Sequence, residues 1–275
     1  MFESITRGWS LQKASFKVLK MDKEILALPL LAGVMTIAAV LALGFGLFLP
    51  LYLADGGFFT LLAVFVIYVA VYAVSIFFNA AVIEMATIRF NGGDPVIKDG
   101  LSKAWSRIGR ILQWAVVAAT VGLIFRILRD QAKDNILARI LVNFLEFGWG
   151  VAVFFVVPIA IFQDVGPLGA IKGSMGLMKR TWGESLAGVA TTTIIFFLAG
   201  LLGLIPLLFA FLLAPVSRVL ASLFVAVAVV YWIILAAVNS AVDGILVAGL
   251  YKYAQEGTMP AVFTDQGIRA ANLAW

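Results

Sequence analysis

Polar side chains that could do chemistry are few in this sequence, and the clearest set lies within its apolar stretches. Asn239 and Asp243 are four residues apart, so they share one face of a helix. Asn79 and Glu84 form a similar pair in an earlier apolar stretch. A carboxylate in such a segment is costly to bury, so it should meet a partner or water. We predict a polar cluster of Asn79, Glu84, Asn239 and Asp243 between the second and the sixth apolar helix of the chain, which could bind a cation or relay protons.

The same four residues have a plainer interpretation. Asn and Ser side chains commonly form hydrogen bonds between neighbouring membrane helices, and a stripe of small residues favours close approach of two backbones. Such a stripe runs beside Asn239, at Ala236, Ser240, Gly244 and Ala248. On this interpretation, which needs nothing further, the four polar residues only hold two helices together, and Glu84 and Asp243 lie near the cytoplasmic interface.

The chain contains neither cysteine nor histidine. Disulfides, thiolate metal sites and cysteine nucleophiles are therefore excluded, and the commonest general base and metal ligand is missing. The sequence also has no metalloprotease helix signature, no Gly-x-Ser-x-Gly elbow, no Walker loop and no dinucleotide fingerprint. It therefore predicts a protein that is not an enzyme and that holds no metal and no cofactor.

Composition predicts the elements that must position these residues. The 275 residues are 63% hydrophobic and 13% charged, whereas soluble domains are about half apolar and about a quarter charged. Several uncharged stretches exceed the roughly 20 residues that cross a bilayer core. The sequence thus predicts an all-α membrane protein with about six transmembrane helices, with a kink at Pro206 and these spans: 25–53, 58–88, 105–130, 140–163, 185–213 and 219–253.

The basic residues predict the orientation of these helices. Of the 20 Lys and Arg residues, most flank the same ends of the spans, including Arg269 near the C-terminus. Under the positive-inside rule these ends face the cytoplasm, which places the N- and C-termini there. The net charge of +5 is spread along the membrane flanks, so we predict no nucleic-acid partner. The exceptions, on the opposite side, are Arg126, Arg129, Lys133, Arg139 and Arg218.

An internal repeat is predicted within this single domain of residues 1–275. Units of about 1–92, 93–164 and 165–260 each begin with an amphipathic helix that feeds a transmembrane hairpin. The apolar residues of each helix form a stripe along one face that includes a tryptophan, namely Trp9, Trp105 or Trp182. Basic residues beside such a stripe are typical of a helix that lies in the headgroup layer of a membrane. The alternative is that every cytoplasmic loop simply needs Lys, Gly and Pro. The predicted lipid-headgroup contacts are Lys13, Lys17, Lys98, Lys103, Lys172, Lys179 and Arg180.

Three smaller polar features have structural interpretations. Glu146 is expected to form an ion pair with Arg139 or Arg126. Asp164 is expected to cap the amphipathic helix that follows it, or to meet Lys172 or Arg180. The hydroxyl groups of Thr191, Thr192 and Thr193 could line a pathway, but bonding back to their own helix is the simpler expectation.

Two stretches of sequence carry a resemblance to known proteins. One contains Gln163-Asp164, Gly166-Pro167 and Lys179-Arg180-Thr181-Trp182-Gly183-Glu184, and the other contains Gly8-Trp9 and Asp22-Lys23-Glu24. Together they resemble an uncharacterised prokaryotic family of six-helix membrane proteins, a domain of unknown function. More distantly the chain looks like the membrane domain of some glycerophosphodiester phosphodiesterases, which is not their catalytic part. The resemblance implies a fold and a prokaryotic cytoplasmic membrane, but no reaction.

The sequence leaves two candidate functions. The first is a non-catalytic membrane scaffold, forming a homo-oligomer and binding lipids or partner proteins. The second is a transporter or channel for a small solute or ion, using the polar cluster. A lipid-processing intramembrane enzyme is a weaker alternative because histidine and cysteine are absent.

Overall fold

The computed structural model describes residues 2–54, 56–260 and 263. Arg269 and the last C-terminal residues, which the charge pattern assigned to the cytoplasm, lie outside the described residues. All regular secondary structure in the described part is helical, with a 3₁₀ turn at Lys23–Leu26 and a π-helical stretch at Gly44–Phe48. The α-helices are α1 (Phe2–Met21), α2 (Ala27–Leu43), α3 (Leu49–Ala54), α4 (Phe58–Phe90), α5 (Ile97–Ser106), α6 (Ile108–Ala132), α7 (Ile136–Val153), α8 (Val156–Phe162), α9 (Pro167–Arg180), α10 (Trp182–Leu202), α11 (Leu204–Leu213) and α12 (Arg218–Glu256).

Six helical segments of the described chain are long and apolar enough to cross a membrane. They confirm the predicted all-α fold and its six spans, and indicate a multi-pass membrane protein. The third span begins at Ile108, because α5 ends at Ser106 and the chain turns at Arg107. The observed spans are Lys23–Ala54, Phe58–Phe90, Ile108–Ala132, Ile136–Phe162, Trp182–Leu213 and Arg218–Glu256.

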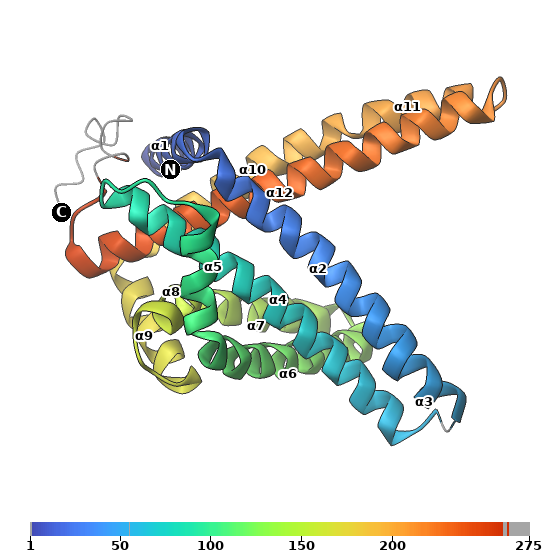
Figure 1. Cartoon of the computed structure of the whole chain (residues 1–275), viewed down its shortest axis with the longest axis horizontal. Coiled ribbons are helices and arrows are strands. Elements are labelled where there is room, and N and C mark those ends of the chain that lie inside the picture. The colour runs from blue at the N-terminus through green and yellow to red at the C-terminus, as the bar shows by residue number, and fades with distance from the viewer. Residues whose placement is uncertain (1, 55, 261–262, 264–275) are drawn as a thin grey trace.

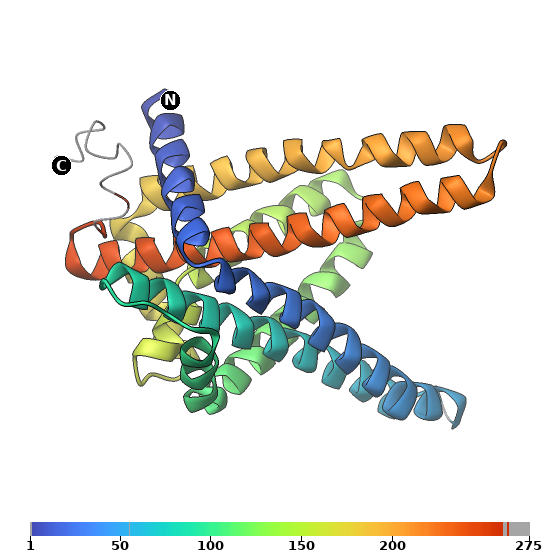
Figure 2. The ribbon, with the colours of Figure 1, turned by 45° about the horizontal axis from the view of Figure 1, so that its top comes forward.

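The spans form three antiparallel hairpins that meet at one end and diverge toward the other (Figure 1). The first pairs α2 and α3 with α4, the second pairs α6 with α7 and α8, and the third pairs α10 and α11 with α12. The short helices α1, α5 and α9 gather at the common end, which we call the base (Figure 2). Only 6% to 33% of the most apolar stretch of each span is buried, so most of its surface would face lipid.

The hydrophobic core lies near the base. It is built from the second half of α4, from α8 and from the second half of α12, with α1, α5 and α9 packed around them. Its largest fully buried side chains include Ile83, Met85, Phe155, Ile159, Ile245 and Leu250.

Each short helix docks on a hairpin other than the one it leads into. Helix α5 packs on α4, α9 packs on α7 and α8, and α1 packs on α10 and α12. Two of these contacts require glycine: a Cβ on Gly100 would lie 2.6 Å from the Ala81 carbonyl oxygen, and one on Gly8 would lie 2.5 Å from that of Ala187. At the third, the Ser174 hydroxyl accepts a hydrogen bond of 2.9 Å from the Phe155 backbone N–H. That these three units arose by duplication stays a prediction.

Local sequence accounts for where the helices stop. The fifth span breaks at Gly203 rather than at Pro206 itself, because the proline lacks the N–H that would reach back four residues toward Leu202. The Asn135 side chain caps α7 by accepting hydrogen bonds from the N–H groups of two following residues. Helix α12 ends at Gly257, whose φ of 73° is left-handed and favours glycine.

An ion-pair network ties the connections at the base together. Arg89, at the end of α4, donates both its Nε and Nη2 to the buried carboxylate of Asp22, and Nη2 also to exposed Asp94. The Glu24 carboxylate accepts a 3.3 Å hydrogen bond from the Ile97 N–H. The chain before α2 is therefore fastened to the chain between α4 and α5.

Asp164 forms a second such link, and its predicted role was wrong. It does not cap α9, whose first turn follows Gly166 without a side-chain cap. Instead its carboxylate accepts a hydrogen bond of 2.8 Å from Arg110 and lies 3.6 Å from Arg107. The Arg110 hydrogen bond lowers the pKa of Asp164.

Asp22→Asn should lower the free energy of unfolding by about 3 kcal/mol, because it leaves the Arg89 guanidinium without its buried counter-charge. Asp94→Asn is the matched control, since it removes the other partner of the same arginine. The Asp94 side chain is 91% exposed, so its loss should cost no more than about 1 kcal/mol. Unfolding in mixed micelles measures both variants, and equal losses would contradict the central role of Asp22.

Candidate functional site

A cavity of about 350 Å³ lies between α1 and α10 near the base, and we call it the lysine cavity. Its lysines recur at intervals of four and three residues, so their side chains follow one face of α1. The Lys13 ammonium nitrogen lies 5.7 Å from the centroid of the Trp9 ring, within the range of a cation–π contact. The cavity is lined by Trp9, Gln12, Lys13, Phe16, Lys17, Lys20 and Ile195.

The opposite face of α1 holds the helix in place. Leu11, Ala14, Ser15 and Val18 are buried there, and Gly8 allows contact with α10. Gln12 is also buried, and its amide donates hydrogen bonds to the Gly188 carbonyl oxygen at 3.3 Å and to the Thr192 hydroxyl. Phe16 stacks on Phe196 of α10, with ring centroids 6.1 Å apart. The packing therefore leaves the lysine-bearing face directed outward.

The other basic residues that were predicted to contact lipid headgroups differ in their exposure. Lys98 on α5 and Lys172, Lys179 and Arg180 on α9 are exposed. Lys103 is half-buried, and its ammonium nitrogen lies 5.1 Å from the centroid of the Phe162 ring. The tryptophans Trp9, Trp105 and Trp182 are 47%, 68% and 48% exposed.

The structure does not bring the four predicted intramembrane residues into one cluster. Asn79 lines a cavity of about 320 Å³ with Ser75 and Ser240. Asn239 and Asp243 line a different cavity, against α10. Glu84 faces α5, where Lys103 and Asp99 are its charged neighbours.

The division follows from helical geometry. On α12 the stripe containing Gly244 faces α4, where a Cβ would lie 2.5 Å from a methyl group of Val82. Asp243, one residue earlier, is turned by about 100° and faces α10 instead. Helices α4 and α12 do pack against each other, as predicted. Glu84 and Asp243, however, lie on faces of these helices that point away from the α4–α12 contact.

The cavity that contains Asp243, which we call the Asp243 cavity, has a volume of about 550 Å³. The hydroxyl groups of Thr192 and Thr193 donate to carbonyl oxygens one turn earlier, at 3.0 and 2.9 Å, which confirms the expected back-bonding. Asp243 is half-buried and forms no hydrogen bond or ion pair with the described residues. The lining is Phe154, Val189, Thr192, Thr193, Phe196, Phe197, Asn239, Asp243, Leu246 and Val247.

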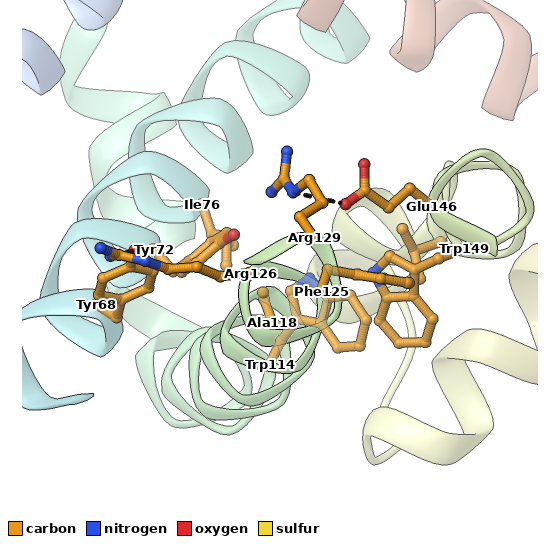
Figure 3. A pocket seen from close by; sticks show the side chains of 12 residues that line it. Tyr68, Tyr72, Ile76, Trp114, Ala118, Phe125, Arg126, Arg129, Glu146 and Trp149 are labelled. Carbon is orange, nitrogen blue, oxygen red and sulfur yellow. Dashed lines mark hydrogen bonds and ion pairs between the residues drawn. The ribbon is translucent and has the colours of Figure 1, made fainter. Parts of the chain in front are cut away.

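A fourth cavity, of about 400 Å³, lies between α4, α6 and α7 (Figure 3). Arg126 donates a 2.6 Å hydrogen bond to the Tyr68 hydroxyl, and the Trp114 and Trp149 rings stack at 6.1 Å. Both basic groups near it are thus engaged by the protein, since Arg129 pairs with Glu146.

The predicted partner of Glu146 was wrong. Arg129 Nε lies 3.1 Å from its carboxylate, as Figure 3 shows. Arg126 points to Tyr68, and Arg139 donates to the Lys133 carbonyl oxygen at 2.8 Å. Neither expected partner therefore reaches Glu146.

Residues 58–261, from α4 to the end of α12, match a family of unknown function, DUF6159. The chain belongs to this family. The match confirms the predicted resemblance to a family of unknown function. Membership of this family assigns no activity to the chain. Comparison with curated proteins finds no match. Six of the seven residues that line the lysine cavity lie on α1, outside the matched region.

Gly8→Ala should destabilise the protein by about 1–3 kcal/mol, because the new methyl group would press on the α10 backbone and on Thr191. Gly33→Ala on α2 is the control, since its Cβ would meet nothing within 4 Å. It should be neutral or stabilising by about 0.5–1 kcal/mol. Thermal unfolding in detergent compares the two, and a harmless Gly8→Ala would refute the close packing of α1 on α10.

Proposed function

We propose that this member of DUF6159 is a non-catalytic protein of the prokaryotic cytoplasmic membrane that binds anionic lipid through the lysine cavity. The observation that carries the proposal is the convergence of Lys13, Lys17 and Lys20 with Trp9 on one cavity where a short amphipathic helix meets a membrane span.

Charge supports this assignment. No acidic residue of the described chain forms an ion pair with any of these three lysines, so their charge is available to a ligand. Each basic residue near the surface attracts an anionic lipid by about 1 kcal/mol. Phe16 and Ile195 give the same cavity an apolar wall, which suits the start of an acyl chain below a phosphate.

The base is proposed to face the cytoplasm, with α1, α5 and α9 in the headgroup layer. Helices α1, α5 and α9 lie there (Figure 1) and carry basic residues, and exposed tryptophans accompany these residues, as in an interfacial belt. A homo-oligomer remains part of the proposal. Its interface would lie away from the small-residue stripe of α12, since Gly244 already packs on Val82 within the chain.

Transport of a small solute or ion is the second candidate function. The observation that favours it is the Asp243 carboxylate, which faces a cavity within the membrane span. Asn79 and Glu84 lie apart from this cavity, so they would not take part.

The triple variant K13Q/K17Q/K20Q should bind phosphatidylglycerol at least tenfold more weakly, because about 1 kcal/mol of attraction is lost with each charge. Titration of purified protein with phosphatidylglycerol, alongside phosphatidylcholine, measures the effect.

The matched control is K98Q/K172Q/K179Q, which removes the same charge from exposed sites on α5 and α9. It should keep most of the affinity for a single bound lipid, because these three side chains lie on two separate helices and none of them lines the lysine cavity. Equal losses in the two triple variants would mean that charge acts diffusely and that the lysine cavity is not a site.

Cysteine labelling tests the orientation, and the absence of native cysteine makes the readout clean. Ser102→Cys on α5 and Asp134→Cys between α6 and α7 place exposed thiols at opposite ends of the spans. In intact cells an impermeant maleimide should label the thiol at 134 and spare the one at 102. Inverted membrane vesicles should give the reverse pattern, and labelling of position 102 in intact cells would disprove the proposed topology.

A further inference from the structure

The Asp243 cavity presents a negative charge with no positive counterpart. Its lining contains no lysine or arginine, and Asp243 lies in the base half of α12, where most of its neighbours along the helix are buried. An ionised carboxylate that is half-buried in a largely apolar cavity is costly unless a cation or water compensates it. The remaining polar groups are those of Asn239, Thr192 and Thr193.

We propose that this cavity binds an organic cation with apolar substituents, whose charged centre sits against the Asp243 carboxylate and whose apolar part packs on Phe154, Phe196 and Phe197. The ligand is opposite in charge to the lipid headgroup proposed for the lysine cavity, and the two cavities share no lining residue.

The size and donor set favour an organic cation over a metal ion. A volume of about 550 Å³ is typical of sites for small organic molecules. A hard metal ion needs several oxygen ligands at about 2.0–2.6 Å, whereas the described residues contain no group of three acidic side chains that could hold one. The one carboxylate and the three phenylalanines instead match a bulky monovalent cation.

The aromatic lining adds a second attraction. The faces of Phe rings carry partial negative charge and attract cations, especially where water is excluded. The Thr192 and Thr193 hydroxyl protons are committed to backbone carbonyls, so toward the cavity these oxygens can only accept. Every polar feature of the threonines thus favours a donor or a cation over an anion.

Access to the site is from the lipid side. Val189 and Phe197 of α10 are 40% and 65% exposed, while Phe154 belongs to the second hairpin. The cavity therefore lies where the second and third hairpins separate, and a ligand that partitions into the bilayer can reach it sideways.

Tetraphenylphosphonium is a suitable probe because it is a permanent, bulky, lipophilic cation. Equilibrium dialysis of the purified full-length protein should give saturable binding near one equivalent. Asp243→Asn should weaken this binding at least tenfold. Glu84→Gln, which neutralises the intramembrane carboxylate outside the cavity, should leave it unchanged.

Phe197→Ala is a second test of the site that does not depend on whether the Asp243→Asn variant folds. The Phe197 side chain is exposed and is not part of the core, so its removal should not disturb folding. It should weaken binding about threefold, in line with the loss of one cation–aromatic contact.

Binding that is unaltered by Asp243→Asn or by Phe197→Ala would overturn the proposal. Displacement of the probe by millimolar Na⁺ or K⁺ would also overturn it, by identifying an inorganic cation site. K13Q/K17Q/K20Q should bind the probe normally, which separates this test from that of the lipid proposal.

Discussion

The fold depends on one constraint: apolar helix faces gain little by leaving lipid for one another. Little of the most apolar stretch of each span is buried inside the protein, so the hydrophobic effect between hairpins cannot hold this protein together within a bilayer. The specific contacts instead gather at the base, where α1, α5 and α9 each fasten a hairpin that they do not lead into. Close glycine contacts and the Asp22–Arg89 pair belong to the same region.

The cavities follow from this arrangement. Hairpins that are joined at one end and diverge at the other leave spaces between them, lined by whichever side chains face inward. Helix α10 forms a wall of two such spaces with opposite chemistry. Gln12 borders the lysine cavity and Thr192 borders the Asp243 cavity, and a single hydrogen bond joins these two side chains. A cavity lined by lysines and a cavity that contains a carboxylate thus lie next to each other, separated by the Gln12–Thr192 and Phe16–Phe196 contacts.

The sequence predicted the elements of this structure more fully than their contacts. Length and polarity determine which stretches can cross a bilayer, so the six spans and the three short helices could be read directly. The break at Gly203 was missed by three residues because Pro206 disturbs the hydrogen bonds of the turn before it. That α5 and α9 dock on the preceding hairpins, and α1 on the last, has no signal in local periodicity.

The site residues show the same limit. Helical spacing correctly put Asn239 and Asp243 on one face, but it could not say that α10, rather than α4, lies opposite. The partners of Glu146 and Asp164 were wrong for a similar reason. Several arginines lay within plausible reach along the chain, and the rotation of α6 selected Arg129 for one acid and Arg110 for the other. The phenylalanines of the Asp243 cavity carry no distinguishing pattern in so apolar a sequence.

The hairpins differ in length, and this has a mechanical consequence. Helix α12 has 39 residues, or about 58 Å at 1.5 Å per residue, while α6 has 25. A hydrocarbon layer of about 30 Å can match both only if the longer hairpin tilts further than the shorter one. Thinner and thicker membranes would then rotate the second and third hairpins by unequal angles. Phe154 belongs to the second hairpin and Asp243 to the third, and both line the Asp243 cavity. Hydrophobic mismatch between protein and membrane would therefore change the width of this cavity.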